Sequence, residues 1–250
     1  QHINPDYAFL LNISNDHIDW HGGVKNYINS KFKIFKHQNK KQFSLTNKKL
    51  SSVFKRRNLL GKLIVPNILS YKKIKSKISS IKPDKTVNII AVSKTFSLDH
   101  IQPLINYGHS HFGENKVQEA FAKWGEQKKI NQNLKLHMIG KLQSNKAKDA
   151  VKLFDYIHSL DNQKLADTLA KHQINLNRNL DYFIQVNIGN EIQKSGIPVN
   201  ELDAFYNYCV KEVGLNIIGL MVIPPDDDNT KKYFKSMSEL KNSLALKELS

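Results

Sequence analysis

The chain has 250 residues and a formal net charge of +16, a length that suits one barrel or two smaller domains. It contains no apolar run of about 18 residues, which argues against a membrane-spanning helix. Its one cysteine, Cys209, excludes an internal disulfide and fits a reducing compartment. We therefore expect a cytoplasmic protein that does not associate with a membrane.

The basic excess lies in the first third of the chain. Residues 1–86 carry 18 Lys/Arg against 4 Asp/Glu, whereas residues 87–250 carry 20 against 18. A basic region can attract nucleic acid or anionic lipid. The commoner interpretation is a lysine-rich composition of the whole chain, because these basic residues lack the interleaved aromatic side chains that stack on single-stranded bases. Nucleic-acid binding through residues 25–86 is kept as an alternative.

The first third of the chain contains two short apolar segments, over residues 7–13 and 43–47, that predict strands. Between them lie a polar loop over residues 14–23 and a helical pattern of apolar residues over 24–35. This alternation of strand and helix is typical of a small α/β fragment.

The polar loop contains a D-H-x-D-x-H cluster formed by Asp16, His17, Asp19 and His21. These residue types bind metals, so the cluster could in principle hold one. The spacing alone is a weak signal, and a solvated loop is the commoner interpretation.

The stretch NPDYAFLLNISNDHIDWHGGVKNYINSKFKIFK resembles the central domain of the Mur ligases, in particular the ligase that adds D-glutamate to UDP-N-acetylmuramoyl-alanine. The resemblance implies that residues 1–66 are a fragment of that domain. It also implies that His17 corresponds to a magnesium-binding histidine and Lys31 to a carbamylated lysine. ATP hydrolysis in that family needs a phosphate loop of the form G-x-x-x-x-G-K-[ST], which this sequence lacks. We therefore expect neither ligase activity nor a functional metal site, and an ATPase assay tests this alternative.

A lysine- and serine-rich segment, residues 67–86, follows this fragment. Apolar residues recur at helical spacing from Ile68 to Ile78, which predicts a partly amphipathic helix, and Pro83 ends it. The segment is either a linker or the helix that precedes the first strand of the next domain. The sequence does not decide between these two roles.

From residue 87 onward the chain repeats one plan: an apolar strand, a polar tip and a helical pattern. Such alternation indicates a parallel sheet, and near-continuous apolar strands indicate that both faces are covered. Many repeats in succession predict a (β/α)8-type TIM barrel, with its chemistry at the C-terminal ends of the strands. The six expected strands end in the segments NIIAVSK, HFGEN, LHMIG, DYIHS, FIQVN and IGLM.

The first of these strands ends on Lys94. A period of two places Ile90, Val92 and Lys94 on one side of the strand, and a lysine among buried apolar residues must have its ammonium desolvated or paired. Desolvation lowers the pKa of a lysine and frees its amine for Schiff-base chemistry. On these residues alone, the commoner interpretation is a strand-end lysine that simply reaches solvent.

The motifs AVSKTFSLDHI, HFGENKVQEA, LHMIGKLQSNKAK, IHSLDNQKLA, FIQVNI, KSGI and GLMVIPP, in this order, closely resemble the pyridoxal phosphate homeostasis proteins. That family shares its fold with the N-terminal barrel of alanine racemase. The resemblance implies that residues 87–250 bind pyridoxal 5'-phosphate (PLP) through a Schiff base on Lys94, with Asn115, Ser159 and Met221 lining the cofactor pocket. It further implies a non-catalytic protein, which we expect to be monomeric, that buffers the cofactor or delivers it to PLP-dependent apo-enzymes.

The resemblance does not extend to a whole barrel. The chain ends in LKELS, and Ser250 is where the seventh strand of the family would begin, so we expect an incomplete barrel with about six of the eight strands. Loops after strands seven and eight commonly hold phosphate in such barrels. A racemase is a further alternative suggested by the fold, although a fold alone does not establish a function.

Overall fold

The chain divides into two compact units, Gln1–Val87 and Asn88–Ser250. The computed structural model describes residues 7–10, 29, 32, 43–46, 53, 56–57, 62–64, 68–81, 87–191, 193–225, 227 and 229–250.

The first unit contains a small parallel sheet. Its strands β1 (Tyr7–Leu10), β2 (Phe43–Thr46) and β3 (Lys62–Ile64) pair in that order. The described residues of the two segments predicted as strands therefore do form strands. Strand β3 was not predicted, because three residues that begin with a lysine are too short for a clear alternation of apolar and polar side chains.

Several predictions for the first unit lie outside the described residues. They are the D-H-x-D-x-H cluster with His17, the counterpart lysine Lys31, and most of the helix expected over 24–35. Asn29 and Phe32 are the described residues of that last segment, and both are helical.

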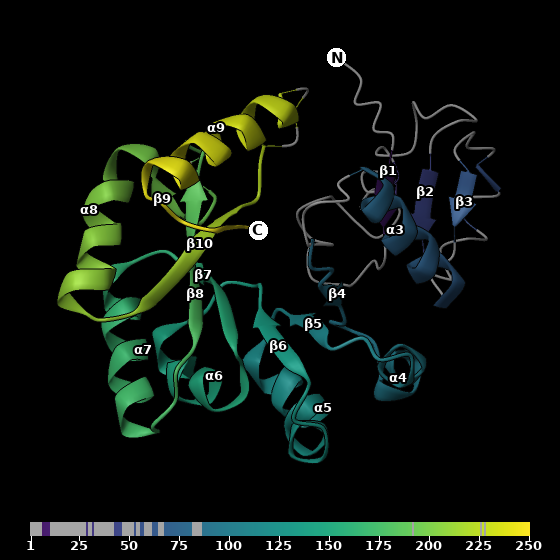
Figure 1. Cartoon of the computed structure of the whole chain (residues 1–250), viewed down its shortest axis with the longest axis horizontal. Helices are drawn as coiled ribbons and strands as arrows, with labels where there is room; N and C mark the ends of the chain where they lie inside the picture. Colours follow the sequence, from purple (N-terminus) through teal and green to yellow (C-terminus); the bar gives the residue numbers. More distant parts are fainter. Residues whose placement is uncertain are drawn as a thin grey trace. The chain divides into compact units, whose positions relative to one another are not determined.

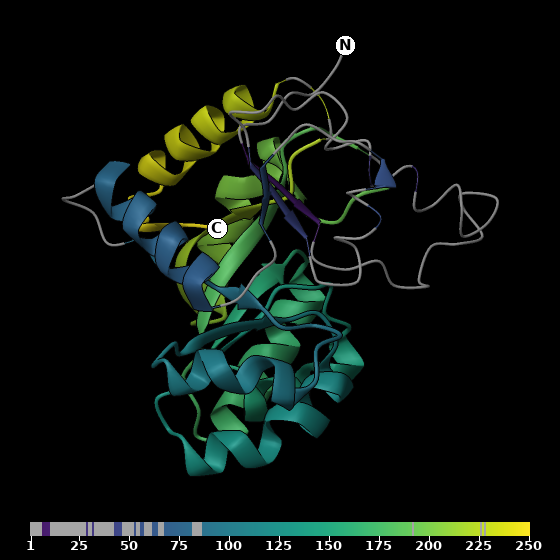
Figure 2. The same cartoon turned by 90° about the vertical axis from the view of Figure 1, so that its right-hand side faces the viewer.

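A single regular helix, α3 (Ile68–Ile81), occupies the lysine-rich segment (Figures 1 and 2). Its apolar side chains Tyr71, Ile74 and Ile78 are half-buried, whereas its lysines are exposed, as the amphipathic pattern predicts. The role of residues 67–86 as a linker or as a leading helix stays a prediction.

The second unit is built on a sheet in which all paired strands run parallel (Figure 1). Sequence neighbours lie side by side, which is the order that a barrel requires. A short strand, β9 (Ile197–Pro198), pairs with β8 off this path. The strands on the path are β4 (Ala91–Val92), β5 (His111–Glu114), β6 (Lys135–Met138), β7 (Tyr156–Leu160), β8 (Asp181–Asn187), β10 (Asn216–Val222) and β11 (Glu248–Leu249).

Helices pack on the outer face of this sheet and form its hydrophobic core. Trp124 from α5 is fully buried and lies against Phe112 of β5, with the two ring centroids 4.8 Å apart. Removal of a large buried aromatic side chain of this kind costs about 3–5 kcal/mol. The helices are α4 (Leu98–Asn106), α5 (Val117–Ile130), α6 (Ala147–Leu153), α7 (Gln163–Asn175), α8 (Leu202–Asn207) and α9 (Thr230–Ser243).

The opposite, inner face of the sheet has a different composition. A Cβ atom at Gly113 would lie 3.1 Å from both the Ile90 and the Ile139 side chains, so these three residues of neighbouring strands share that face. Phe183 and His158 stack there with ring centroids 4.2 Å apart. None of these five residues belongs to the helix-side core. The inner face therefore carries ring and polar side chains as well as apolar ones.

The predicted fold, a parallel and incomplete barrel-type sheet with helices on its outer face, is confirmed. Two details differ. The sheet has a seventh strand on its path, β11, which begins at Glu248 rather than at Ser250. The short strand β9, which was not predicted, follows Gly196, whose φ of +122° turns the chain back alongside β8.

Candidate functional site

The four predicted cofactor residues lie at the C-terminal ends of their strands. Lys94 follows β4 and Asn115 follows β5, on neighbouring strands whose register pairs Val92 with Gly113. Ser159 and Met221 occupy the last part of β7 and β10. The structure thus brings Lys94 and Asn115 to adjacent positions at the strand ends, with Ser159 and Met221 further along the same sheet.

Lys94 is exposed. The expectation that burial desolvates its ammonium is therefore wrong, and the commoner interpretation, a strand-end lysine that reaches solvent, describes its surroundings. The next residue, Thr95, has a φ of 67°, in the left-handed region that residues with a branched Cβ rarely adopt. The backbone thus turns sharply away directly after Lys94, and the amine is left at the strand end.

Asn115 and Ser159 share an unusual property. The Asn115 Oδ1 and Ser159 Oγ atoms are buried, and neither has a hydrogen-bond partner in the described part of the chain. Buried polar atoms are nearly always paired, and an unpaired one costs about 1–3 kcal/mol. Two such atoms at the strand ends of the sheet that also carries the exposed Lys94 are the feature expected of a binding site for a small polar ligand.

A bulge sets the position of Ser159. Ile157 pairs with Tyr182 and Leu160 with Ile184, so β7 has two residues between these pairs, His158 and Ser159, where β8 has only one. Both Ile157 and Leu160 belong to the helix-side core, so His158 and Ser159 lie between two outward-facing residues. A strict period of two could not place both of them there, so this arrangement was not readable from the sequence.

Met221 is buried but lies outside the helix-side core, whereas its neighbours Leu220 and Val222 are part of that core. The alternation of a strand therefore directs the Met221 thioether toward the inner face. A polarisable side chain at this place suits an aromatic ligand.

Gly140, at the end of the LHMIG segment, is a site residue that the sequence did not single out. A Cβ atom at this position would lie 2.5 Å from the Asn115 carbonyl oxygen and 2.7 Å from the Asn115 Cβ atom. Only glycine allows the chain after β6 to approach Asn115 this closely. The signal in the sequence is a glycine directly after a buried strand.

Below the strand ends, three histidines from neighbouring strands form a ladder of hydrogen bonds. His111 Nδ1 lies 2.9 Å from His137 Nε2, and His137 Nδ1 lies 2.9 Å from His158 Nε2. His158 Nδ1 then lies 2.8 Å from Ser250 Oγ. We call His111, His137, His158 and Ser250 the histidine ladder.

Burial keeps the ladder neutral. Burial, followed by the neighbouring His158 and His111 rings, lowers the pKa of His137 to about 2. Burial likewise lowers the pKa of His158 to about 4. The pKa of His111 is lowered too, by burial and by the Lys135 ammonium. A neutral imidazole carries one donor and one acceptor, which matches one hydrogen bond on each side of His137 and His158.

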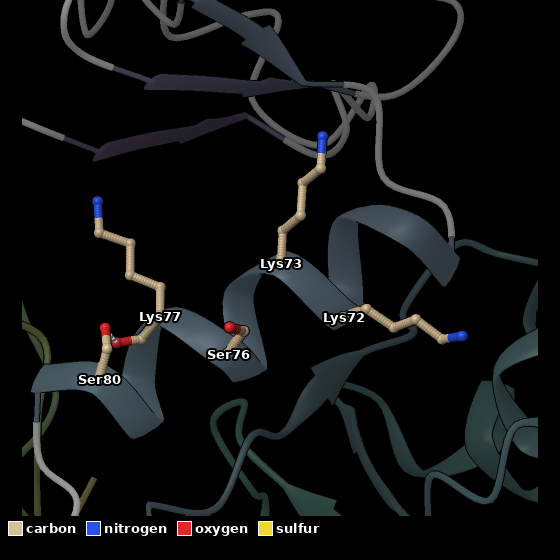
Figure 3. Close-up of a pocket in the computed structure, with 5 residues that line it drawn as sticks. All are labelled: Lys72, Lys73, Ser76, Lys77 and Ser80. Carbon is tan, nitrogen blue, oxygen red and sulfur yellow. Dashed lines mark hydrogen bonds between the residues drawn. The ribbon is translucent and has the colours of Figure 1, made fainter.

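A cavity of about 600 Å³ lies along α3, in the first unit, and it does not coincide with the strand-end site. In Figure 3, Lys73 and Lys77 extend to one side of the helix and Lys72 to the other. Ser76 and Ser80 complete the lining, and the Ser80 hydroxyl donates to the Lys77 carbonyl at 2.8 Å. All five lining residues are exposed side chains of one helix, so we do not regard this cavity as the active site.

Two further features concern partners and metals. In the part of the chain that the structure describes, no group of three or more His, Cys, Asp or Glu side chains is placed to hold a metal ion. Among the described helices, none is both long and apolar enough to cross a membrane.

Comparison with known families matches both parts of the chain. Residues 70–249 match the alanine racemase, N-terminal domain, and residues 1–63 match the Mur ligase middle domain. The chain is 33% identical over 164 residues to the pyridoxal phosphate homeostasis protein of Aquifex aeolicus. The aligned region covers 64% of this chain and 71% of that protein. It is 36% identical over 160 residues to the protein of the same name from Buchnera aphidicola, covering 64% of this chain and 68% of the relative.

Solved structures give the same picture. The chain resembles PipY of Synechococcus elongatus, in a structure without PLP, with a TM-score of 0.61 at 34% identity. That likeness covers 70% of this chain and 87% of PipY. A second structure of PipY, with PLP bound, has a TM-score of 0.58 at 32% identity, over 70% of this chain and 87% of PipY.

Proposed function

The chain belongs to the alanine racemase N-terminal domain family and to the pyridoxal phosphate homeostasis proteins, and from this premise we propose that it binds PLP through a Schiff base on Lys94. One observation carries the proposal. The accessible Lys94 amine shares the C-terminal strand ends with Asn115 Oδ1 and Ser159 Oγ, two buried polar atoms without partners in the described part of the chain.

The donor set fits this cofactor. PLP supplies an aldehyde, which condenses with a lysine amine and releases water to give a Schiff base. Lys94 provides the amine, and its exposure leaves the amine open to a ligand that arrives from solvent. Asn115 Oδ1 could accept one hydrogen bond from a ligand, and the Ser159 hydroxyl could donate or accept another. The Met221 thioether would contact the aromatic ring of the cofactor.

We further propose that the protein holds and releases the cofactor and does not turn over a substrate. The relatives carry the name of homeostasis proteins, which supports this role. Racemisation needs a proton donor and acceptor with a pKa near the working pH. His158, the histidine next to Ser159, has a pKa lowered to about 4 and is engaged in the histidine ladder, so it is poorly suited to that task.

The same proposal covers location and partners. We propose that the protein is a cytoplasmic monomer that delivers PLP to PLP-dependent apo-enzymes. We also propose that its first 66 residues are a fragment of a Mur ligase central domain and have no ligase activity. Residues 67–86 connect this fragment to the cofactor-binding part.

The test is to trap the lysine that reacts with PLP. The purified chain is mixed with limiting PLP and reduced with borohydride, and the labelled lysines are mapped by mass spectrometry. We expect the label to concentrate on Lys94 and to disappear in Lys94→Ala. Lys141→Ala is the matched control, because Lys141 is also an exposed lysine just after a strand of the same sheet. Diffuse labelling that is the same in wild type and Lys94→Ala would contradict the proposal.

The carrier role is tested with the same preparation, before reduction. The loaded protein is separated from free PLP and mixed with an apo-aminotransferase. We expect the apo-enzyme to regain activity with wild type and with Lys141→Ala, but not with Lys94→Ala. Racemisation of an amino acid by the loaded protein would point to turnover instead.

A further inference from the structure

Lys94 is preceded by a residue whose polar groups are all engaged. Ser93 is 3% exposed, and its N–H donates to the Gly113 carbonyl at 2.9 Å. Its carbonyl accepts from Lys123 Nζ at 2.7 Å and from the Phe96 N–H at 3.1 Å. Its hydroxyl donates to Glu114 Oε1 at 2.7 Å. The backbone at Ser93 is therefore held from three directions.

The groups that hold Ser93 also hold each other. The Glu114 side chain is fully buried, and the Lys123 side chain is only 12% exposed. Lys123 Nζ lies 2.8 Å from Glu114 Oε1, and the Trp124 indole N–H donates to the same oxygen at 2.8 Å. We call Ser93, Glu114, Lys123 and Trp124 the Ser93 clamp. It joins the end of β4 to β5 and α5.

The short length of β4 makes this clamp consequential. The strand has two residues, and only Ala91 and Val92 pair in register with β5. Beyond them, two backbone hydrogen bonds at Ser93 and the side chains of the clamp fix the chain before it turns at Thr95. Lys94 thus lies between Ser93, whose carbonyl accepts from the Lys123 ammonium, and Thr95, whose backbone is in the left-handed region.

A purely stabilising role explains the clamp poorly. A buried ion pair loses most of its attraction to the cost of desolvation, and packed apolar side chains of similar size are often at least as stable. An apolar pair could not, however, donate a hydrogen bond to the Ser93 carbonyl. The ammonium of Lys123 does this, and Glu114 balances its charge.

We propose that Lys123 and Glu114 are positioning residues for the cofactor site: they fix the carbonyl and hydroxyl of Ser93, and thereby direct Lys94 toward the ligand. This inference rests on the proposed binding of PLP at Lys94. Neither residue touches the ligand in this scheme, and both act from the helix side of the sheet through the backbone of Ser93.

The experiment compares two double variants. Glu114→Gln/Lys123→Met removes the donor to Ser93 without leaving an unpaired buried charge, and the glutamine oxygen can still accept from Ser93 and Trp124. The matched control is Lys128→Met/Asp155→Asn, since Lys128 is also on α5 and lies 2.5 Å from Asp155 in a partly buried ion pair. The control removes an equivalent pair that does not contact Ser93.

Two quantities are measured for each folded variant. Imine absorbance during a PLP titration gives the apparent Kd. Competitive acetylation without PLP, mapped by mass spectrometry, shows whether the Lys94 amine stays accessible and reactive. In Glu114→Gln/Lys123→Met we expect a Kd about tenfold weaker or more, because a misplaced reactive group loses its oriented geometry, with acetylation of Lys94 unchanged. The control double variant should keep the wild-type Kd, and Lys123→Arg, which retains a cationic donor, should recover most of the affinity.

The outcomes separate this inference from the proposed function. If wild type forms no imine at Lys94, the proposed function fails, whatever the variants do. If wild type labels Lys94 and Glu114→Gln/Lys123→Met binds PLP equally well, the positioning role is overturned. Equal weakening in both double variants also overturns it, because general loss of packing then explains the effect. Should the double variant not fold, Ser93→Ala decides: it removes the hydroxyl that donates to Glu114 and, at 3.4 Å, to the Gly113 carbonyl, and wild-type affinity in that variant overturns the inference.

Discussion

The histidine ladder makes the stability of the second unit depend on pH between about pH 8 and pH 5. In the folded chain the pKa is about 2 for His137 and about 4 for His158, while an unfolded chain restores both to the ordinary value of 6.5. Both folded values are depressed, so the stabilisation is complete above pH 6.5 and is lost as the pH falls below it. Unfolding then takes up protons, because the released imidazoles become charged.

The size of the effect follows from these values. Lowering the pH from about 8 to about 5 favours the unfolded chain by about 2 kcal/mol for each ring whose folded pKa lies well below 5, or about 4 kcal/mol for His137 and His158 together. That is a large part of the roughly 5–15 kcal/mol by which domains are usually stable. His111, whose pKa is lowered by burial and Lys135 and raised by Asp155, adds to the effect in the same direction.

Urea unfolding at a series of pH values measures it. The chain has two tryptophans, so Trp20→Phe leaves Trp124, which is buried in the second unit, as the fluorescent probe. In this background we expect His137→Asn to lose about 2 kcal/mol less unfolding free energy than the parent between about pH 8 and pH 5. His100→Asn, which removes an exposed histidine outside the ladder, is the control and should follow the parent.

Parallel plots of unfolding free energy against pH for His137→Asn and its parent would refute this reasoning.

The geometry also limits which ring nitrogens of the histidine ladder can carry the protons. Two arrangements satisfy every bond, one with all three protons on Nδ1 and one with all three on Nε2, because each neutral ring must donate on one side and accept on the other. NMR of the ring nitrogens should therefore find His111, His137 and His158 in a single common tautomer.

Two further predictions concern single positions. Gly140→Ala should lower the thermal midpoint of unfolding and weaken PLP binding several-fold. The new methyl group would lie 2.5 Å from the Asn115 carbonyl oxygen, and overpacking of this kind costs about 1–3 kcal/mol. A melting curve and a PLP titration check this, and wild-type values in both would contradict it. Cys209 is buried, and burial raises the pKa of its thiol to about 12. Iodoacetamide near pH 8 should therefore alkylate Cys209 only in urea. Rapid alkylation of the folded chain would contradict the burial of this thiol.

The parallel sheet was predictable because its strands are short apolar runs with helical patterns between them. Parity along β4 correctly separated Ile90, which lies with Gly113 on the inner face, from Ala91 and Ser93, which face the helices. These are local features, and a period of two is enough to read them. Strands of two residues, such as β9 and β11, contain too few positions for any period.

The surroundings of the site needed the register between strands. Glu114 and Lys123 are nine residues apart, and their contact depends on how α5 returns over β5. The histidine ladder needs the stagger between strands, since the register pairs His137 with Gly113 and with Tyr156, not with another histidine. The bulge that inserts a residue at His158 and Ser159 breaks the period on which the sequence-based assignment relied.

The two faces of the sheet thus place different demands on the sequence. On the outer face, side chains such as Trp124 and Tyr182 are buried against helices, and a substitution there mainly changes the free energy of unfolding. At the strand ends, Asn115 and Ser159 keep buried polar atoms unpaired, which costs stability in the chain by itself. A group that binds there and supplies the missing partners recovers that cost, so the cofactor should raise the stability of the second unit by mass action in proportion to its affinity. The Ser93 clamp contacts the residue directly before Lys94 from the helix side of the sheet, and this contact is the route by which we propose that Glu114 and Lys123 position Lys94.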